Sequence, residues 1–165
     1  MAKRIITISR EFGSGGRFIG EEVAKKLGIA YYDKEMIGQI AEQAGLSSEY
    51  VRENAELSPK KGWFAYAFSG RDITGKSVED MVYEAQRKVI MEIAEKENCV
   101  IIGRNADFIL KDRKDVLNVF IHGSIPEKVR RICSLYNVTE VDAIKMINDI
   151  DKRRRTNYNF YTEQK

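Results

Sequence analysis

The sequence predicts an α/β fold in which helices cover both faces of a parallel sheet. Short apolar runs rich in β-branched residues alternate with longer segments in which apolar residues recur at helical spacing. Glycines or polar caps mark the change from one kind of segment to the other. An alternating order of strands and helices requires right-handed crossovers and a parallel sheet, whose ligands bind at the carboxyl ends of the strands.

Four segments have the character of strands. They are residues 4–9, 30–32, 99–102 and 116–121. The third is apolar throughout, which is typical of a strand buried on both faces of a sheet. Their carboxyl ends bring a glycine-rich turn, Asp33, residues 103–105 and His122 to one edge, where we expect the functional site.

The helices expected between the strands have recognisable starts and apolar faces. They are predicted at 16–27 with Gly28 past the end, at 34–44, from Ser77 to 97, from Ser124 to 136, and from Thr139 into a basic run. Three of these begin with Ser or Thr three residues before Asp or Glu, the spacing of a capping box. The first helix should have its apolar face at Ile19, Val23 and Leu27, and the last should turn inward Val141, Ile144, Ile147 and Ile150.

The composition is that of one soluble globular domain spanning residues 1–165. Hydrophobic residues make up 43% and charged residues 32% of the chain, and no apolar run approaches the roughly 20 residues of a membrane span. The first residues lack the apolar segment of a signal peptide, so we expect a cytoplasmic protein without a membrane partner. A net charge of +3 does not by itself imply a nucleic-acid partner.

The cysteine and histidine content argues against a metal held by protein side chains. Cys99 and Cys133 stand far apart in the sequence, and His122 is the one histidine available to join them. We expect both thiols to be small buried apolar groups and His122 to be structural.

Residues 45–76 break the regular pattern and carry a group of aromatic residues. This segment is either a mobile flap over a substrate or a helical insertion that packs its aromatic side chains on the core.

The segment from Glu11 to Phe18 has the frame of a phosphate-binding loop. Its glycines permit positive φ and let backbone N–H groups approach phosphate oxygens at the start of the next helix. A Walker A loop reads G-x-x-x-x-G-K-[ST], and here Arg17 replaces the lysine and Phe18 the hydroxyl residue. Arginine keeps the charge with a different reach, and Ser14 is a hydroxyl within the loop.

Together with three further segments, this turn makes the chain similar to the cytidylate kinase-like proteins, a branch of the P-loop nucleoside monophosphate kinases. The matching stretches cover nearly all of the chain and are residues 8–17, 32–35, 100–107 and 151–155, followed by Tyr158, Tyr161 and Thr162. The resemblance implies a P-loop NTPase-type three-layer sandwich with a five-stranded parallel sheet. It also implies an acceptor-side helical insertion at 45–76, an arginine-bearing lid at 151–165, and transfer of a phosphoryl group from ATP, with Mg²⁺, to a CMP-like monophosphate.

The resemblance assigns roles to single residues. The donor phosphates would be held by Gly13, Ser14, Gly15, Gly16 and Arg17. Arg104 would grip the acceptor monophosphate beside Asn105, which stands where cytidylate kinases proper carry an aspartate. Asp33, also on the acceptor side, would either orient magnesium through water or cap a helix.

The lid of the family carries arginines that meet the transferring phosphoryl group, and three stand here in a row. At about 100° per residue, Arg153, Arg154 and Arg155 cannot all face one phosphate. We expect Arg153 and Arg155 to act in catalysis together with Arg17.

In family members a fifth strand and a closing helix follow the Tyr-Thr segment and would fall after Lys165. The strand at 116–121 should then be an edge strand. The sequence is a piece of a longer chain, or another subunit of a homo-oligomer covers this edge, or the protein is a reduced relative.

Three other functions stay open. A nucleotide-binding protein without efficient turnover would fit the altered turn. A dinucleotide-binding domain would use Asp33 as its ribose-binding acid, although Phe18 stands where that motif needs a glycine. Nucleic-acid binding through residues 152–155 would weaken steeply with salt.

Overall fold

The computed structural model describes residues 4–33 and 78–163, in which four strands form one parallel sheet. The strands are β1 (Ile5–Arg10), β2 (Ala30–Tyr32), β3 (Cys99–Ile102) and β4 (Val116–Ile121), in the order β2-β3-β1-β4. Every pairing between neighbours is parallel. The predicted α/β class is confirmed, and so are the four predicted strands, the first of them shifted by one residue.

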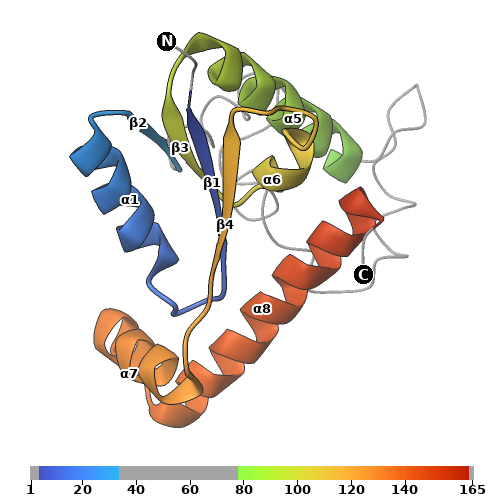
Figure 1. Ribbon diagram of the computed structural model, residues 1–165. Coiled ribbons are helices and arrows are strands. Elements are labelled where there is room, and N and C mark those ends of the chain that lie inside the picture. Colours follow the sequence, from blue (N-terminus) through green and yellow to red (C-terminus); the bar gives the residue numbers. More distant parts are fainter. Residues whose placement is uncertain (1–3, 34–77, 164–165) are drawn as a thin grey trace.

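The helices form layers around this sheet. They are α1 (Gly16–Leu27), α5 (Val78–Lys96), α6 (Ala106–Ile109), α7 (Ile125–Tyr136) and α8 (Glu140–Thr162). Figure 1 shows α1 on one face of the sheet, α5 and α6 on the other, and α7 and α8 beyond the carboxyl ends of the strands. The one-turn helix α6 was not predicted, since four residues are too few to show a helical period.

Side chains of the two central strands alternate between two cores. Cys99 and Ile101 of β3 pack with α5 and α6, whereas Val100 and Ile102 pack with α1. Each of these four residues is 0% exposed. Cys99 is therefore the buried apolar group that the sequence predicted, and burial raises the pKa of its thiol to about 12.

Helix α1 packs on the sheet through its small residues, which corrects the predicted apolar face at Ile19 and Leu27. Its buried residues are Gly16, Gly20 and Ala24, while Ile19 is 46% and Leu27 58% exposed. Val23 is partly buried and packs against the core as predicted. A Cβ on Gly20 would lie 2.4 Å from Cδ1 of Ile102. The helix therefore approaches the sheet so closely that only small residues fit between them.

A third cluster joins α7 to α8, and it too differs from the prediction. Its buried members are Val129, Ile132, Ala143 and Ile147. Val141 is 62% and Ile144 43% exposed, so they do not face inward as expected. The buried stripe of α8 instead follows Ala143 and Ile147, four residues apart on one face.

The caps of α7 and α8 are of two kinds. Thr139 caps α8, because its Oγ1 accepts a hydrogen bond of 3.2 Å from the N–H of Asp142. The predicted capping box at Ser124 is not formed, since its hydroxyl donates to the Glu127 carboxylate at 3.2 Å and makes no bond to the backbone.

Strand β4 is an edge strand of the described sheet, as predicted, because it pairs with β1 alone. The predicted helix at 34–44, the insertion at 45–76 and the cap at Ser77 lie outside the described residues. Within the described ranges, no helix combines the length and apolar character that crossing a membrane requires.

The packing of α1 gives a test of the fold. Gly20→Val should lower the free energy of unfolding by about 1–3 kcal/mol, because the added carbons overpack the contact with β3. Leu27→Ala should change it by less than about 0.5 kcal/mol, since that side chain is largely exposed. Urea unfolding measures both. Helix propensity favours valine over glycine, so a loss of stability in Gly20→Val reports packing. A larger loss of stability in Leu27→Ala than in Gly20→Val would contradict this arrangement.

Candidate phosphoryl-transfer site

The turn between β1 and α1 has the geometry of an anion cradle. Gly13 has a φ of +79° and Gly15 of +87°, which glycine adopts readily. A Cβ on Gly13 would lie 3.1 Å from Cγ1 of Ile132, and one on Gly16 would lie 2.7 Å from Cβ of Arg10. No acidic residue stands in the first turn of α1, so the partial positive charge at its N-terminus is not neutralised within that turn. An anion in the turn would meet this charge.

Asp33, at the end of β2, holds two arginines from different segments. Its Oδ2 lies 3.1 Å from Nε of Arg17, and its Oδ1 lies 3.4 Å from Nη1 of Arg104. The Arg17 side chain is 49% exposed, whereas that of Arg104 is 2% exposed. The carboxylate thus fixes a cation of the glycine-rich turn and a cation of the turn after β3 in one ion-pair group.

The turn after β3 places three consecutive residues in the left-handed region. The φ values are +67° for Gly103, +60° for Arg104 and +54° for Asn105. Such values are strained for residues other than glycine and persist only where the surroundings hold them. One support is the side chain of Gln86 on α5, which is 2% exposed and donates to the Arg104 carbonyl at 2.5 Å.

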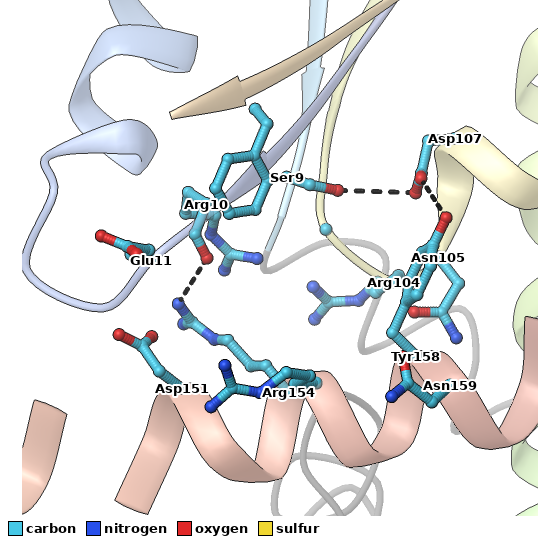
Figure 2. A pocket seen from close by; sticks show the side chains of 13 residues that line it. Ser9, Arg10, Glu11, Arg104, Asn105, Asp107, Asp151, Arg154, Tyr158 and Asn159 are labelled. Carbon is cyan, nitrogen blue, oxygen red and sulfur yellow. Dashed lines mark hydrogen bonds between the residues drawn. The ribbon is translucent and has the colours of Figure 1, made fainter. Parts of the chain in front are cut away.

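A cavity of about 420 Å³ opens between this turn, the end of β1 and α8. It is lined by Ser9, Arg10, Glu11, Gly103, Arg104, Asn105, Asp107, Phe120, Asp151, Arg154, Arg155, Tyr158 and Asn159. Figure 2 shows the labelled side chains converging on this space from the three segments. Four arginines face three carboxylates in the lining, a balance that suits an anionic ligand with several oxygens.

Helix α8 is attached to the rest of the site at both ends of the cavity (Figure 2). Arg154 donates to the Arg10 carbonyl at 3.2 Å. One turn further along, the Tyr158 hydroxyl donates to Asp107 at 2.8 Å, and Asp107 also accepts from Ser9 at 3.4 Å. Burial, and after it the bond to the Asp107 carboxylate, raises the pKa of Tyr158, so this hydroxyl remains a donor at neutral pH.

A buried lysine on α7 connects the glycine-rich turn to α8. The Nζ of Lys128 lies 2.9 Å from Glu11 and 3.2 Å from Asp151. Its hydrogen bond is the largest influence on Glu11 and holds the pKa of that carboxyl below its ordinary value. Asp151 in turn accepts the backbone N–H of Phe12 at 2.6 Å.

The residues expected at the site fall into two groups. Arg104, Asn105 and Arg155 line the cavity. The others lie outside its lining: Gly13, Ser14, Gly15 and Gly16 form the turn, Arg17 and Asp33 pair with each other, and Arg153 lies 4.0 Å from Asp149. His122 is exposed and also outside the lining.

Several residues of the site were not singled out from the sequence. Gln86 and Lys128 lie in segments with helical period, where a buried polar residue looks like part of a solvated face. Asp151 belongs to the matching stretch 151–155, but no role was predicted for it. Arg154 was named as part of the basic run, but it was not expected at the site, because the sequence does not define which face of the helix it occupies.

The described residues do not form a site for a divalent ion of their own. Among residues 4–33 and 78–163, no group of three or more His, Cys, Asp or Glu side chains could hold a metal. The Ser14 hydroxyl donates to the Glu11 carbonyl at 2.8 Å, and the Asp33 carboxylate already pairs with two arginines. These side chains therefore do not fit a protein-held Mg²⁺.

Comparisons with known proteins identify relatives over the whole chain. The model of the cytidylate kinase-like family matches residues 5–165. An uncharacterized protein from Eubacterium ventriosum superposes with a TM-score of 0.73 at 28% identity, covering 99% of this chain and 80% of that one. No curated protein sequence matches the chain significantly.

Two shikimate kinases share the fold at lower identity. The enzyme from Bacteroides thetaiotaomicron has a TM-score of 0.56 at 19% identity, covering 96% of this chain and 82% of its own. The enzyme from Acinetobacter baumannii, in complex with shikimate, has a TM-score of 0.51 at 15% identity over 96% of this chain and 79% of its own. At these identities the similarity shows a common fold alone.

The ion pair of Glu11 should make stability depend on pH. In the unfolded chain this carboxyl keeps its ordinary pKa of 4.5, and in the folded protein the pKa is lower. As the pH falls, the unfolded chain therefore binds the proton first, so the contribution is present above about pH 5 and is lost through the folded pKa. Glu11→Gln should be less stable than the native protein at pH 7, and the difference should shrink at pH 4.

Urea midpoints at both pH values measure this difference. Glu22→Gln, at an exposed position on α1, is the matched control and should follow the native protein throughout. A difference for Glu11→Gln that stays constant from pH 7 to pH 4 would refute the role of this ion pair.

Proposed function

The chain belongs to the cytidylate kinase-like family, and from this membership and the cavity we propose that it transfers the γ-phosphoryl group of ATP to a nucleoside monophosphate, with CMP as the first acceptor to test. The observation that carries the proposal is the convergence of Arg104, Arg154 and Arg155 on one cavity beside the glycine-rich turn. Phosphoryl transfer depends mainly on positioning and on neutralising charge at phosphate oxygens, and arginines supply both. A cytoplasmic location, where both nucleotides are available, is part of this proposal.

The donor side of the proposal rests on the turn before α1. Gly13 and Gly15 turn the backbone at positive φ, so that N–H groups of the turn and of the helix start can approach the phosphates of ATP. Arg17 follows the turn and is half exposed, held by Asp33. It would contact the β- and γ-phosphates in place of the usual lysine, and Mg²⁺ would be brought by the nucleotide phosphates themselves.

The acceptor side rests on the turn after β3. The buried guanidinium of Arg104 is fixed by Asp33 and faces the cavity, where it would bind the acceptor phosphate beside Asn105. A phosphate oxygen of the acceptor then attacks the γ-phosphorus, the new O–P bond forms, and the bond from the γ-phosphorus to the bridging oxygen breaks. ADP leaves with that electron pair.

Residues 151–165 would act as the lid over the transferring group. Arg154 and Arg155 of α8 line the cavity, so they are the lid arginines best placed to neutralise the equatorial oxygens. Arg153, which lies outside the cavity lining and 4.0 Å from Asp149, is the remaining lid arginine to test by substitution.

One observation favours a second candidate function, nucleotide binding without efficient turnover. Arg17 pairs with Asp33, and Ser14 bonds within its own loop, so the turn presents neither the lysine nor the hydroxyl of a Walker A loop. Tight binding of ATP without ADP release in the presence of any monophosphate would support this candidate over the kinase.

Substitution of Arg104 tests the acceptor site. Arg104→Ala should lower kcat/KM for CMP by about 10²–10³-fold, because it removes a charged donor to the reacting phosphate. The dissociation constant for ATP should change by a much smaller factor, because the donor turn keeps its own groups and Arg17 stays paired with Asp33 when Arg104 is removed. ADP release in a coupled assay measures the first quantity and titration calorimetry the second.

Arg130→Ala is the matched control, since this arginine is exposed on α7 and does not line the cavity. It should retain native kinetics. If the native protein releases ADP at one rate with and without every monophosphate tried, the proposed transfer is wrong.

A further inference from the structure

The side chain of Lys128 is buried in a position that ordinary packing does not explain. It is 3% exposed, although it lies on α7 close to the glycine-rich turn. Burying an ammonium group is costly unless opposite charges and hydrogen bonds surround it. Here two carboxylates do so, Glu11 at 2.9 Å and Asp151 at 3.2 Å.

Each of these carboxylates holds a backbone N–H as well. The second oxygen of Asp151 accepts the N–H of Phe12 at 2.6 Å, and Glu11 accepts the N–H of Gly123 at 3.4 Å. The single ammonium of Lys128 therefore joins three segments: the start of the turn, the loop before α7, and α8.

The carbon stem of Lys128 and the next turn of α7 complete the support. A Cβ placed on Gly13 would lie 3.2 Å from both Cβ and the carbonyl oxygen of Lys128. Arg131, three residues further on, donates to the carbonyl of Gly13 at 2.5 Å. Residues 11–13 are thus held through a side chain, an N–H and a carbonyl, all by groups of α7 and α8.

We propose that Lys128 is a positioning residue that fixes residues 11–13 against α8, so that phosphate binding by the turn and the placement of Arg154 and Arg155 depend on one another. This inference rests on the proposed function. Asp151 stands one helical turn before Arg154 on α8, and Arg154 itself donates to the carbonyl of Arg10. A shift of Asp151 therefore moves the arginines with it.

If Lys128 only stabilised the fold, ATP affinity would recover together with stability once the unpaired charge was removed. When one partner of a buried ion pair is removed, stability falls because the remaining charge is left unpaired, and it recovers when that charge is removed too. Asp151→Asn removes the charge but keeps an oxygen that can accept the Phe12 N–H. Lys128→Met combined with Asp151→Asn should therefore regain part of the melting temperature lost in Lys128→Met, since the remaining carboxylate of Glu11 is partly exposed, without regaining affinity for ATP.

The test measures ATP binding and amide exchange in the full chain. Lys128→Met should weaken ATP binding about tenfold or more, the loss expected from one charged hydrogen bond, and should lower kcat with CMP. Lys128→Arg keeps the charge and should stay within about threefold of native binding. Lys145→Met is the matched control, because that lysine also pairs with an aspartate but is 74% exposed.

Hydrogen exchange at the Phe12 amide reports positioning independently of nucleotide. It should be faster in Lys128→Met than in the native protein and unchanged in Lys145→Met. The inference is overturned if Lys128→Met lowers the melting temperature but leaves both the ATP affinity and the exchange at the Phe12 amide at their native values. If exchange is faster in Lys128→Met but the native protein binds no nucleoside triphosphate, the proposed function is refuted. The link between the turn and α8 is retained in that case.

If Lys128→Met does not fold, Asp151→Ala gives a second test, because it removes one of the two carboxylates that hold Lys128. Its readout is ATP affinity, since loss of the acceptor speeds exchange at the Phe12 amide in any case. Weaker ATP binding in this variant supports the inference, and native ATP binding overturns it.

Discussion

Parallel pairing of β1 with both β3 and β4 is the constraint on which the whole site depends. Because β1 lies between them, the turns that leave these strands meet at one edge. Two backbone hydrogen bonds continue the pairing past the strand ends: Gly103 donates to the Ile8 carbonyl at 2.9 Å, and Glu11 donates to the Ile121 carbonyl at 3.0 Å. The glycine-rich turn is therefore adjacent to the turn that carries Arg104 and to the loop that leads into α7. Segments separated by about ninety residues are brought together by the sheet alone, before any side chain of the site is considered.

Carboxylates organise the cations that this edge collects. A site for phosphates needs several positive groups close together, and these repel one another when no ligand is present. Asp33 pairs with Arg17 and Arg104, while Glu11 and Asp151 share Lys128. Each carboxylate binds some of the donors of a cation and so fixes the orientation of the side chain. The remaining donors are then already ordered before a ligand binds, and binding does not have to order them. Asp107 plays the corresponding part for the neutral hydroxyls of Ser9 and Tyr158.

The sequence predicts the strand positions and the ends of α1 and α7, because these depend on local periodicity and on glycine. Gly28, for example, ends α1 at a φ of +63°, as a glycine after the last apolar residue predicts. The sequence also predicts the sheet edge at which the cavity opens, because the ends of parallel strands meet there. Faces of helices were harder, since burial of Gly20 depends on how near α1 lies to Ile102, which no local pattern records. The same holds for the site. That an arginine of the basic run would face the cavity was predictable, whereas the choice of Arg154 depends on the rotation of α8, and the partners of Lys128 are more than twenty residues away.

In the left-handed turn at Gly103, Arg104 and Asn105, the backbone conformation that places the Arg104 side chain also lowers the stability of the protein. An arginine at a φ of +60° costs roughly 1–2 kcal/mol relative to a relaxed backbone. Glycine would remove that cost at position 104 and would also remove the guanidinium, so the two properties cannot be improved by the same substitution. Glycine at position 104 would also break the buried ion pair with Asp33, a loss of stability that opposes the relief of strain. The same ion pair therefore holds Arg104 in its strained conformation and directs its guanidinium, so substitution of Asp33 would release both.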